Sequence, residues 1–354
     1  MVNFMKRKIK ILIFVLIGVI ISSGTIGTLF FIAVIQNASP SARYGSAMVY
    51  DPVLQKAIFF GGGYSTATDD ELVNDMWLYD PTSNIWTEIN PTVKPSARSG
   101  HSMVYDSINH RTILFGGWDD TIGLMNDTWI YDSQTNQWTK VFPVNPPFTR
   151  QSNAMYYDTN AQRVILFGGY REVGGHLDDT WQYNYSDNSW TELNPTSNPS
   201  GRYGSRMVYD PINQRGVLFG GRGTTIMDDT WIYYYGNNTW AELSSASSPD
   251  TRYWHGMVYD SNYHKVIVFG GRNAGAPGQA LEDTWVFDPS NNEWTELLPP
   301  SHPSNRMDSS VIYDSNHQKT ILFGGFRFSG NTLGDTWTYA YNSNSWNIVK
   351  GGDL

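Results

Sequence analysis

The sequence predicts an all-β fold: a six-bladed β-propeller of four-stranded antiparallel blades, preceded by one N-terminal transmembrane helix. A repeat with constant internal spacing occurs six times. Each copy contains four short runs of β-branched and aromatic residues bounded by turn residues, as expected for one antiparallel blade. Aromatic residues make up 15% of the chain and charged residues only 16%, a composition that favours packed strands and turns over helices.

Each copy is defined by an Arg, a Gly pair, an Asp and a closing Trp. Arg to the first Gly is always 18 residues, Asp to Trp is always 11, and Trp to the next Arg is always 12. Only the distance from Gly to Asp varies, from 9 to 14 residues. The landmark residues are Arg43, Arg98, Arg150, Arg202, Arg252 and Arg306, with Asp75, Asp127, Asp179, Asp229, Asp283 and Asp335. All insertions and deletions therefore fall in one connection per repeat.

The four runs of each copy are labelled a to d in chain order. The turn between c and d carries Asn two residues before the closing Trp, where we expect a left-handed backbone. The Gly pair that ends run b indicates positive φ or a lack of room for a side chain. A blade is hydrophobic on both faces and must stack on its neighbours, so six copies predict a closed ring. A right-handed solenoid is the alternative, but four antiparallel strands per repeat favour a propeller.

The pattern resembles the kelch repeat over about residues 43–349. The resemblance lies in Arg before the first strand, Gly-Gly ending the second, Tyr-Asp ending the third in two copies, and Trp opening the fourth. It implies that strand a is innermost and strand d outermost. Kelch propellers usually close by mixing strands from both chain ends in one blade, whereas this chain starts at a and stops at d. We therefore expect closure by side-chain packing between the first and last blades, unless residues 36–42 contribute.

The N-terminus carries a basic cluster followed by an apolar segment. Lys6, Arg7 and Lys8 lead into residues 9–35, where Lys10 is the only charge. This length predicts a cytoplasmic stub and signal anchor over residues 1–35, then a linker over 36–42. The positive-inside rule places the propeller outside the cytoplasm as a single-pass membrane protein. A signal peptide cleaved near 22–24, giving a secreted protein, is the alternative.

The propeller is predicted to span residues 43–350, with blades of about 43–94, 95–146, 147–198, 199–248, 249–302 and 303–350. Apart from the four N-terminal basic residues, the chain carries 20 Lys and Arg against 33 Asp and Glu. Such acidity excludes a nucleic-acid partner. The absence of Cys excludes disulfides. Four Asn-x-Ser/Thr sequons would permit glycosylation of an exported chain, at Asn37, Asn126, Asn184 and Asn237.

Strand direction predicts a binding face. Strands alternate within a blade, so the variable b-c connections share one face with the d-a connections. Variable loops on a rigid scaffold usually carry binding, and we expect a protein or carbohydrate ligand there. The repeated Arg and Asp are interpreted as structural ion pairs between blades, and the repeated Trp as core. The expected site residues are Trp118, Tyr170, Arg171, Arg222, Trp254, His255, Arg272, Phe326 and Arg327.

No catalytic set, cofactor or metal is predicted. A galactose-oxidase-type radical site needs a Tyr crosslinked to Cys, and the chain has no Cys. The seven His show no metal-ligand spacing. Some kelch-like propellers are enzymes, so the alternative is a carbohydrate-active enzyme of the sialic acid epimerase type, with His255 or His101 as acid or base. A binding scaffold anchored in the membrane is the favoured function.

Overall fold

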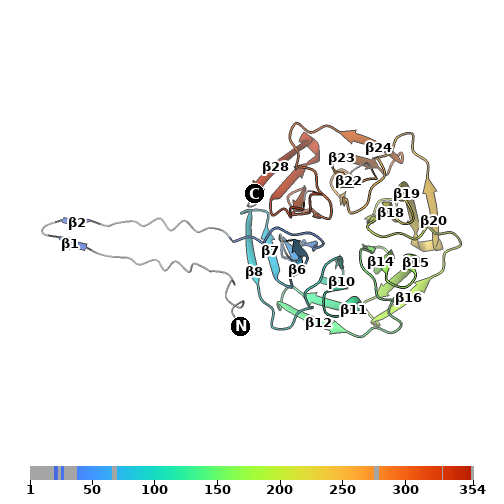
Figure 1. Ribbon diagram of the computed structural model, residues 1–354, viewed down its shortest axis with the longest axis horizontal. Helices are drawn as coiled ribbons and strands as arrows, with labels where there is room; N and C mark the ends of the chain where they lie inside the picture. Colours follow the sequence, from blue (N-terminus) through green and yellow to red (C-terminus); the bar gives the residue numbers. More distant parts are fainter. Residues whose placement is uncertain are drawn as a thin grey trace. The chain divides into compact units, whose positions relative to one another are not determined.

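The structure is a computed structural model that describes residues 20–22, 25–27, 38–65, 70–274, 279–328 and 330–351. Ser39 to the C-terminus is one compact unit. The described residues of this unit form six four-stranded antiparallel sheets around a central axis (Figure 1). The predicted all-β, six-bladed propeller is confirmed.

The strands within each blade run in chain order from the innermost to the outermost. Blade one comprises β3 (Ala47–Asp51), β4 (Lys56–Phe60), β7 (Met76–Asp80) and β8 (Ile85–Ile89), and its b-c connection holds the hairpin of β5 (Gly63–Ser65) and β6 (Asp70–Leu72). Blade two comprises β9 (Ser102–Asp106), β10 (Arg111–Asp119), β11 (Gly123–Asp132) and β12 (Gln137–Val141). Blade three comprises β13 (Ala154–Asp158), β14 (Arg163–Arg171), β15 (Gly175–Asn184) and β16 (Ser189–Leu193).

Blades four to six repeat this order. Blade four comprises β17 (Arg206–Asp210), β18 (Arg215–Arg222), β19 (Ile226–Tyr234) and β20 (Thr239–Leu243), with a 3-10 turn at Tyr235–Asn237. Blade five comprises β21 (Gly256–Asp260), β22 (Lys265–Arg272), β23 (Ala280–Asp288) and β24 (Glu293–Leu297). Blade six comprises β25 (Ser310–Asp314), β26 (Lys319–Phe323), β27 (Thr336–Ala340) and β28 (Ser345–Lys350), with a 3-10 turn at Tyr341–Ser343. The outer d strands, such as β12 and β16, lie at the rim in Figure 1.

Most of the predicted transmembrane segment lies outside the described residues. Its described parts are β1 (Ile20–Ser22) and β2 (Thr25–Gly27), an antiparallel pair where the sequence predicted helix. Across the described ranges, the structure contains no helix that is both long enough and apolar enough to span a bilayer.

The predicted turn conformations are confirmed. Asn84 has φ 57° and Asn136 has φ 54°, and the corresponding Asn of every other blade is also left-handed. In blade one the Tyr79 hydroxyl donates to the Asn84 side chain at 2.6 Å, which holds the turn against the strand. The Gly pairs have positive φ throughout, and at Gly116 a Cβ would lie 2.7 Å from the Arg150 carbonyl oxygen. Glycine is thus required because the next repeat's backbone crosses there.

The core lies between blades. Trp190 of blade three packs on Phe115 of blade two, and its indole N–H donates to the Thr128 hydroxyl at 3.1 Å. The d-strand tryptophans are buried in all six blades. Those of strand c are buried in the first three blades but only partly buried at Trp231, Trp285 and Trp337. The repeated Trp are therefore core residues, with the later c-strand positions nearer to solvent.

The ring closes between blades six and one without strand exchange, since each sheet uses strands of one repeat only. Side chains pack across this seam, and the Trp86 indole N–H donates to the Thr336 hydroxyl at 3.1 Å. The prediction that side-chain packing alone closes the ring is nevertheless incomplete, because backbone hydrogen bonds also cross this seam. The Arg43 N–H donates to the Leu333 carbonyl at 3.0 Å, and the Gly325 N–H donates to the Arg43 carbonyl at 2.9 Å. Backbone hydrogen bonds therefore join the first and last blades in the same way as they join other neighbouring blades.

Candidate binding site at the channel mouth

The six landmark Arg are structural residues with almost no exposed surface. Arg150 donates to both carboxylate oxygens of Asp179 at 2.6 and 2.7 Å, and to the Gly168 carbonyl at 3.0 Å. Its own carbonyl accepts from Gly117 of the preceding blade at 2.9 Å. Each ion pair thus lies within one repeat, so the prediction of ion pairs between blades is wrong. Each Arg therefore contacts the preceding blade through its backbone carbonyl, while its guanidinium pairs within its own repeat.

A ring of six residues surrounds the mouth of the central channel on the b-c/d-a face. These residues stand two positions after each landmark Arg and all have positive φ: Gly45, Gly100, Ser152, Gly204, Trp254 and Asp308. We call them the mouth ring. Each backbone N–H donates to the carbonyl of the equivalent residue in the preceding blade, at 2.7 to 2.8 Å for five of them and 3.3 Å for Gly45 to Asp308. The hydrogen bonds form a closed circle from blade to blade.

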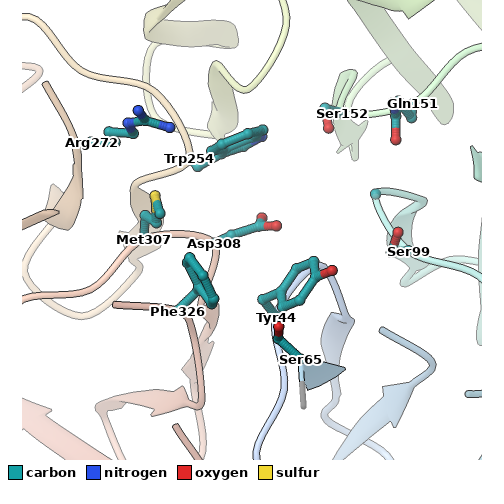
Figure 2. A pocket seen from close by; sticks show the side chains of 11 residues that line it. Tyr44, Ser65, Ser99, Gln151, Ser152, Trp254, Arg272, Met307, Asp308 and Phe326 are labelled. Carbon is teal, nitrogen blue, oxygen red and sulfur yellow. The ribbon is translucent and has the colours of Figure 1, made fainter. Parts of the chain in front are cut away.

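A pocket of about 290 Å³ opens at the centre of this ring, and we call it the mouth pocket. Figure 2 shows the Asp308 carboxylate pointing into the space between Trp254 and Tyr44, with Phe326 beside Tyr44. The Tyr44 and Phe326 rings meet edge to face, with centroids 5.6 Å apart. The lining residues are Tyr44, Ser65, Ser99, Gly100, Gln151, Ser152, Trp254, Arg272, Met307, Asp308 and Phe326. Five of the six blades therefore build one pocket.

A second pocket of about 380 Å³ lies on the other side of Trp254, and we call it the side pocket. It includes Tyr170, His176 and Tyr203, whose rings contact one another with centroids 5.5 to 6.0 Å apart. Tyr203 also contacts Trp254 at 5.8 Å. The two pockets therefore share one aromatic wall.

Two arginines are held at this wall by aromatic faces. The guanidinium groups of Arg222 and Arg272 lie 5.5 and 5.8 Å from the Tyr253 ring centroid. Arg222 also donates to the Tyr253 hydroxyl at 3.3 Å. Arg222 lines the side pocket and Arg272 the mouth pocket. Tyr253 thus positions one cation toward each pocket.

The charge at the base of the mouth pocket comes from Asp308. Burial raises the pKa of this carboxyl above its ordinary value, although the nearby Arg206 acts in the opposite direction. The Arg206 guanidinium lies 3.4 Å from one Asp308 oxygen. Arg206 belongs to the inner strand of blade four and lines the channel cavity of about 160 Å³ beneath. This ion pair joins blades four and six across the channel.

The structure brings together only some of the predicted site residues. Trp254, Arg272 and Phe326 line the mouth pocket, and Tyr170 and Arg222 line the side pocket. Arg171 lies in a different pocket with Phe148, which its guanidinium covers at 4.8 Å, and Arg327 lies in another near Leu333. Trp118 lines none of these pockets and donates to Asp120 at 3.3 Å.

The two histidines proposed as acid or base, His101 and His255, do not lie on the open face. His255 is fully buried against Phe219, and His101 is 5% exposed against Phe60. Burial, together with the charge of Arg98, lowers the pKa of His101 to about 3, and burial and Arg252 lower that of His255 well below the ordinary value. Both imidazoles are therefore neutral parts of the inner packing, a position that does not suit an acid or base for a bound sugar.

Sequence reasoning missed Asp308, Arg206 and the residues directly after each landmark Arg. Tyr44, Tyr203 and Tyr253 stand at that position, and each pairs by backbone with the residue after a Gly pair. The sequence signal that could have revealed Asp308 is the mouth-ring position, where Ser, Trp and Asp replace Gly in blades three, five and six. In the part of the chain that the structure describes, no three His, Asp or Glu side chains are grouped as metal ligands.

Comparison with known proteins agrees with the geometry. The family described as the KLHDC2/KLHL20/DRC7 Kelch-repeats domain matches residues 47–263 and 244–352. Kelch domain-containing protein 3 of Rattus norvegicus is 28% identical over 51% of this chain and 48% of its own length. Mei4-dependent protein 6 of Schizosaccharomyces pombe is 30% identical over 35% of this chain and 19% of its own length.

A third relative is tRNA wybutosine-synthesizing protein 4 of Saccharomyces cerevisiae, 24% identical over 46% of this chain and 23% of its own length. The matched regions thus cover less than half of each of these three relatives. The family match, by contrast, extends over nearly the whole propeller, from the inner strand of the first blade to the outer strand of the last. With six concordant blades and this match, the chain belongs to the kelch-repeat family.

Proposed function

We propose that this chain is a protein-binding scaffold whose partner docks on the channel-mouth face. Kelch propellers generally bind proteins, and this chain is one of them. The observation that supports this face is the concentration of departures from the repeat around the mouth pocket. Ser152, Trp254 and Asp308 replace Gly in the mouth ring, and the variable b-c connections emerge on the same face.

The composition of this face suits protein recognition. Tyr, Trp and Arg dominate binding hot spots because they offer large contact areas at low entropic cost. Here Tyr203, Tyr253 and Trp254 contact one another, and Arg222 and Arg272 are held by Tyr253. An aromatic and arginine surface whose side chains already hold one another loses less rotamer freedom on binding.

The test is selection of a displayed library of random dodecapeptides on the purified full chain. Selected peptides are then titrated against Trp254→Gly, which installs the residue found at this ring position in three other blades. We expect a loss of at least about tenfold in affinity, equivalent to about 1.4 kcal/mol.

The matched control is Tyr263→Ala, an exposed aromatic in an a-b turn on the opposite face. It should leave binding unchanged. Failure to select any peptide, or peptides that lose affinity with Tyr263→Ala and not with Trp254→Gly, would overturn the proposal.

We further propose that the chain is anchored in a membrane with the propeller outside the cytoplasm. Support comes from the basic cluster ahead of residues 9–35, a long stretch with a single charge. Carbonate extraction of membranes tests the anchor, because an integral protein stays in the pellet. Full release of the intact chain into the supernatant would refute it.

A carbohydrate ligand is a second candidate for the side pocket only. The nearly parallel Tyr203 and His176 rings, 14° apart, and the neighbouring Tyr170 offer faces on which a sugar ring could stack. A glycan array probed with the full chain and with Tyr203→Ala tests this. Binding unaffected by the substitution would exclude the side pocket.

A further inference from the structure

The mouth pocket contains a carboxylate whose hydrogen-bonding capacity is partly unused. Asp308 is 18% exposed at the side chain, and its carboxylate accepts a hydrogen bond from the Arg206 side chain to Oδ1 at 3.4 Å and another from the backbone N–H of Gly45. The landmark Asp179 instead accepts two bonds from Arg150 and one from the Trp181 indole, at 2.6 to 2.7 Å. A partly buried carboxylate with one long side-chain bond and one backbone bond can accept a further donor, preferably a charged one.

Aromatic rings surround this carboxylate. Trp254, Tyr44 and Phe326 come from blades five, one and six and lie around Asp308 in Figure 2. The face of an aromatic ring carries negative charge and attracts cations, most strongly when the site is desolvated. A carboxylate among such rings is the usual composition of a site for an organic cation. The chain as a whole carries a net charge of −9, which favours a cationic partner over an anionic one.

From this arrangement we infer that the mouth pocket takes the side chain of a lysine on the docked protein, with its ammonium on Asp308 and its methylene chain along Trp254 and Tyr44. The inference rests on the proposed scaffold function and specifies what its partner must present.

Lysine fits better than arginine. Arg206 donates to Oδ1 of Asp308 and the backbone N–H of Gly45 also donates to the carboxylate, so the two oxygens are not both open to a ligand side by side. Arginine recognises carboxylates by two parallel bonds to both oxygens, whereas an ammonium is a compact point charge that needs only one acceptor. The volume of about 290 Å³ lies just under the range of about 300–1,000 Å³ typical of small-molecule sites, which suits one long side chain.

Arg272, the cation that also lines the pocket, is held away from Asp308. Its guanidinium lies over the Phe328 ring at 5.0 Å and near Tyr253 at 5.8 Å. In Figure 2 it lies to the upper left of Trp254, apart from the Asp308 carboxylate. Arg272 thus leaves the space between Trp254 and Tyr44 open to a ligand.

The test uses the full chain labelled with 5-fluorotryptophan and observed by fluorine NMR, with the Trp254 resonance assigned from its absence in Trp254→Phe. The probe is Nα-acetyl-lysine methylamide, and the comparator is the norleucine analogue, which has the same chain length without the charge. We expect the lysine probe to shift the Trp254 resonance with at least about tenfold higher affinity than the norleucine analogue.

Asp308→Asn, nearly isosteric, should abolish this preference. Asp250→Asn should retain it, because Asp250 is an exposed residue of a d-a connection outside the pocket and the substitution removes the same charge. Equal affinity for both probes, no shift with either, or a preference that survives Asp308→Asn would overturn the lysine assignment.

These outcomes are distinguishable from failure of the scaffold proposal. Library peptides that require Trp254 but contain no essential lysine would uphold the docking face and refute the lysine site. Lysine-dependent shifts without any face-dependent peptide would uphold the pocket and refute the scaffold.

Discussion

The backbone N–H of Gly45 donates a 3.3 Å hydrogen bond to the carbonyl of Asp308, and it completes the circle of bonds around the channel mouth. The other five bonds of the circle are 2.7 to 2.8 Å long. This longest bond lies where the two ends of the propeller meet. The remaining contacts of that seam, such as Trp86 with Thr336, match those of internal seams in kind and distance.

Trp86→Phe should therefore destabilise the protein about as much as Trp190→Phe, its equivalent at an internal seam. Each substitution deletes a 3.1 Å hydrogen bond and leaves a buried threonine hydroxyl without its indole donor. We expect each to lower the free energy of unfolding by about 1–3 kcal/mol in urea titrations. A clearly smaller loss for Trp86→Phe would show that the closing seam contributes less than the others.

Arg150→Met should lower the free energy of unfolding by about 3–5 kcal/mol, because Asp179 is left partly buried without its cation. The loss should change little with salt, since the Arg150 side chain is fully buried and poorly screened. Arg163→Met is the control: Arg163 is partly buried at a strand end and donates to the adjacent Gln162 carbonyl. It should cost no more than about 0.5 kcal/mol. Equal losses would contradict a structural role for the landmark Arg.

Asp127 should make stability depend on pH. Burial alone would raise its pKa, but hydrogen bonds and charge from Arg98, with Trp129 and Lys140, hold the pKa below its ordinary value. The stabilisation is therefore complete above the pKa of an unfolded aspartate, about 3.9, and is lost as pH falls through the lower folded-state value. Asp127→Asn should be less stable than wild type at neutral pH, and the difference should narrow below pH of about 4.

Urea titrations across that pH range measure the difference, with the exposed Asp250→Asn as a control that should track wild type throughout. A gap of constant size between Asp127→Asn and wild type would mean that the carboxylate of Asp127 does not stabilise the fold through its charge.

Features set by local conformation could be predicted from the sequence. Asn84 and the pair beginning at Gly61 have positive φ, and only a few residue types tolerate that backbone, so the repeat itself reveals them. The Arg206 and Asp308 pair could not be found this way, because it joins positions 102 residues apart and exists only once the ring has closed.

The wrong placement of His255 has a simple cause. The backbone is left-handed at Trp254, with φ 56°, just before β21 begins at Gly256, and Trp254 lines the mouth pocket while its neighbour His255 is buried against Phe219. The sequence showed that Trp254 replaces the Gly of three other copies, but it gave no orientation for Trp254 or His255. Tyr203 and Tyr253 were missed because a Tyr after the landmark Arg also occurs in blade one and so did not look exceptional.

Trp254→Gly should separate stability from binding. Trp254 has φ 56°, a left-handed backbone that costs a non-glycine residue about 1–2 kcal/mol. Glycine relieves this cost, while the lost contacts of a partly buried ring oppose it, so the free energy of unfolding should stay within about 1 kcal/mol of wild type. Trp240→Ala, which deletes a buried Trp from the core, should instead lose about 3–5 kcal/mol.

Peptide binding should show the reverse order: Trp254→Gly should weaken it at least about tenfold, and Trp240→Ala should preserve it wherever the protein remains folded. Such a result would mean that Trp254 contributes little to folding and is needed for recognition. Its strained backbone would then be explained by ligand binding. If Trp254→Gly proved as destabilising as Trp240→Ala, the indole would be a packing residue of the mouth ring, and the docking face would have to be sought elsewhere on the propeller.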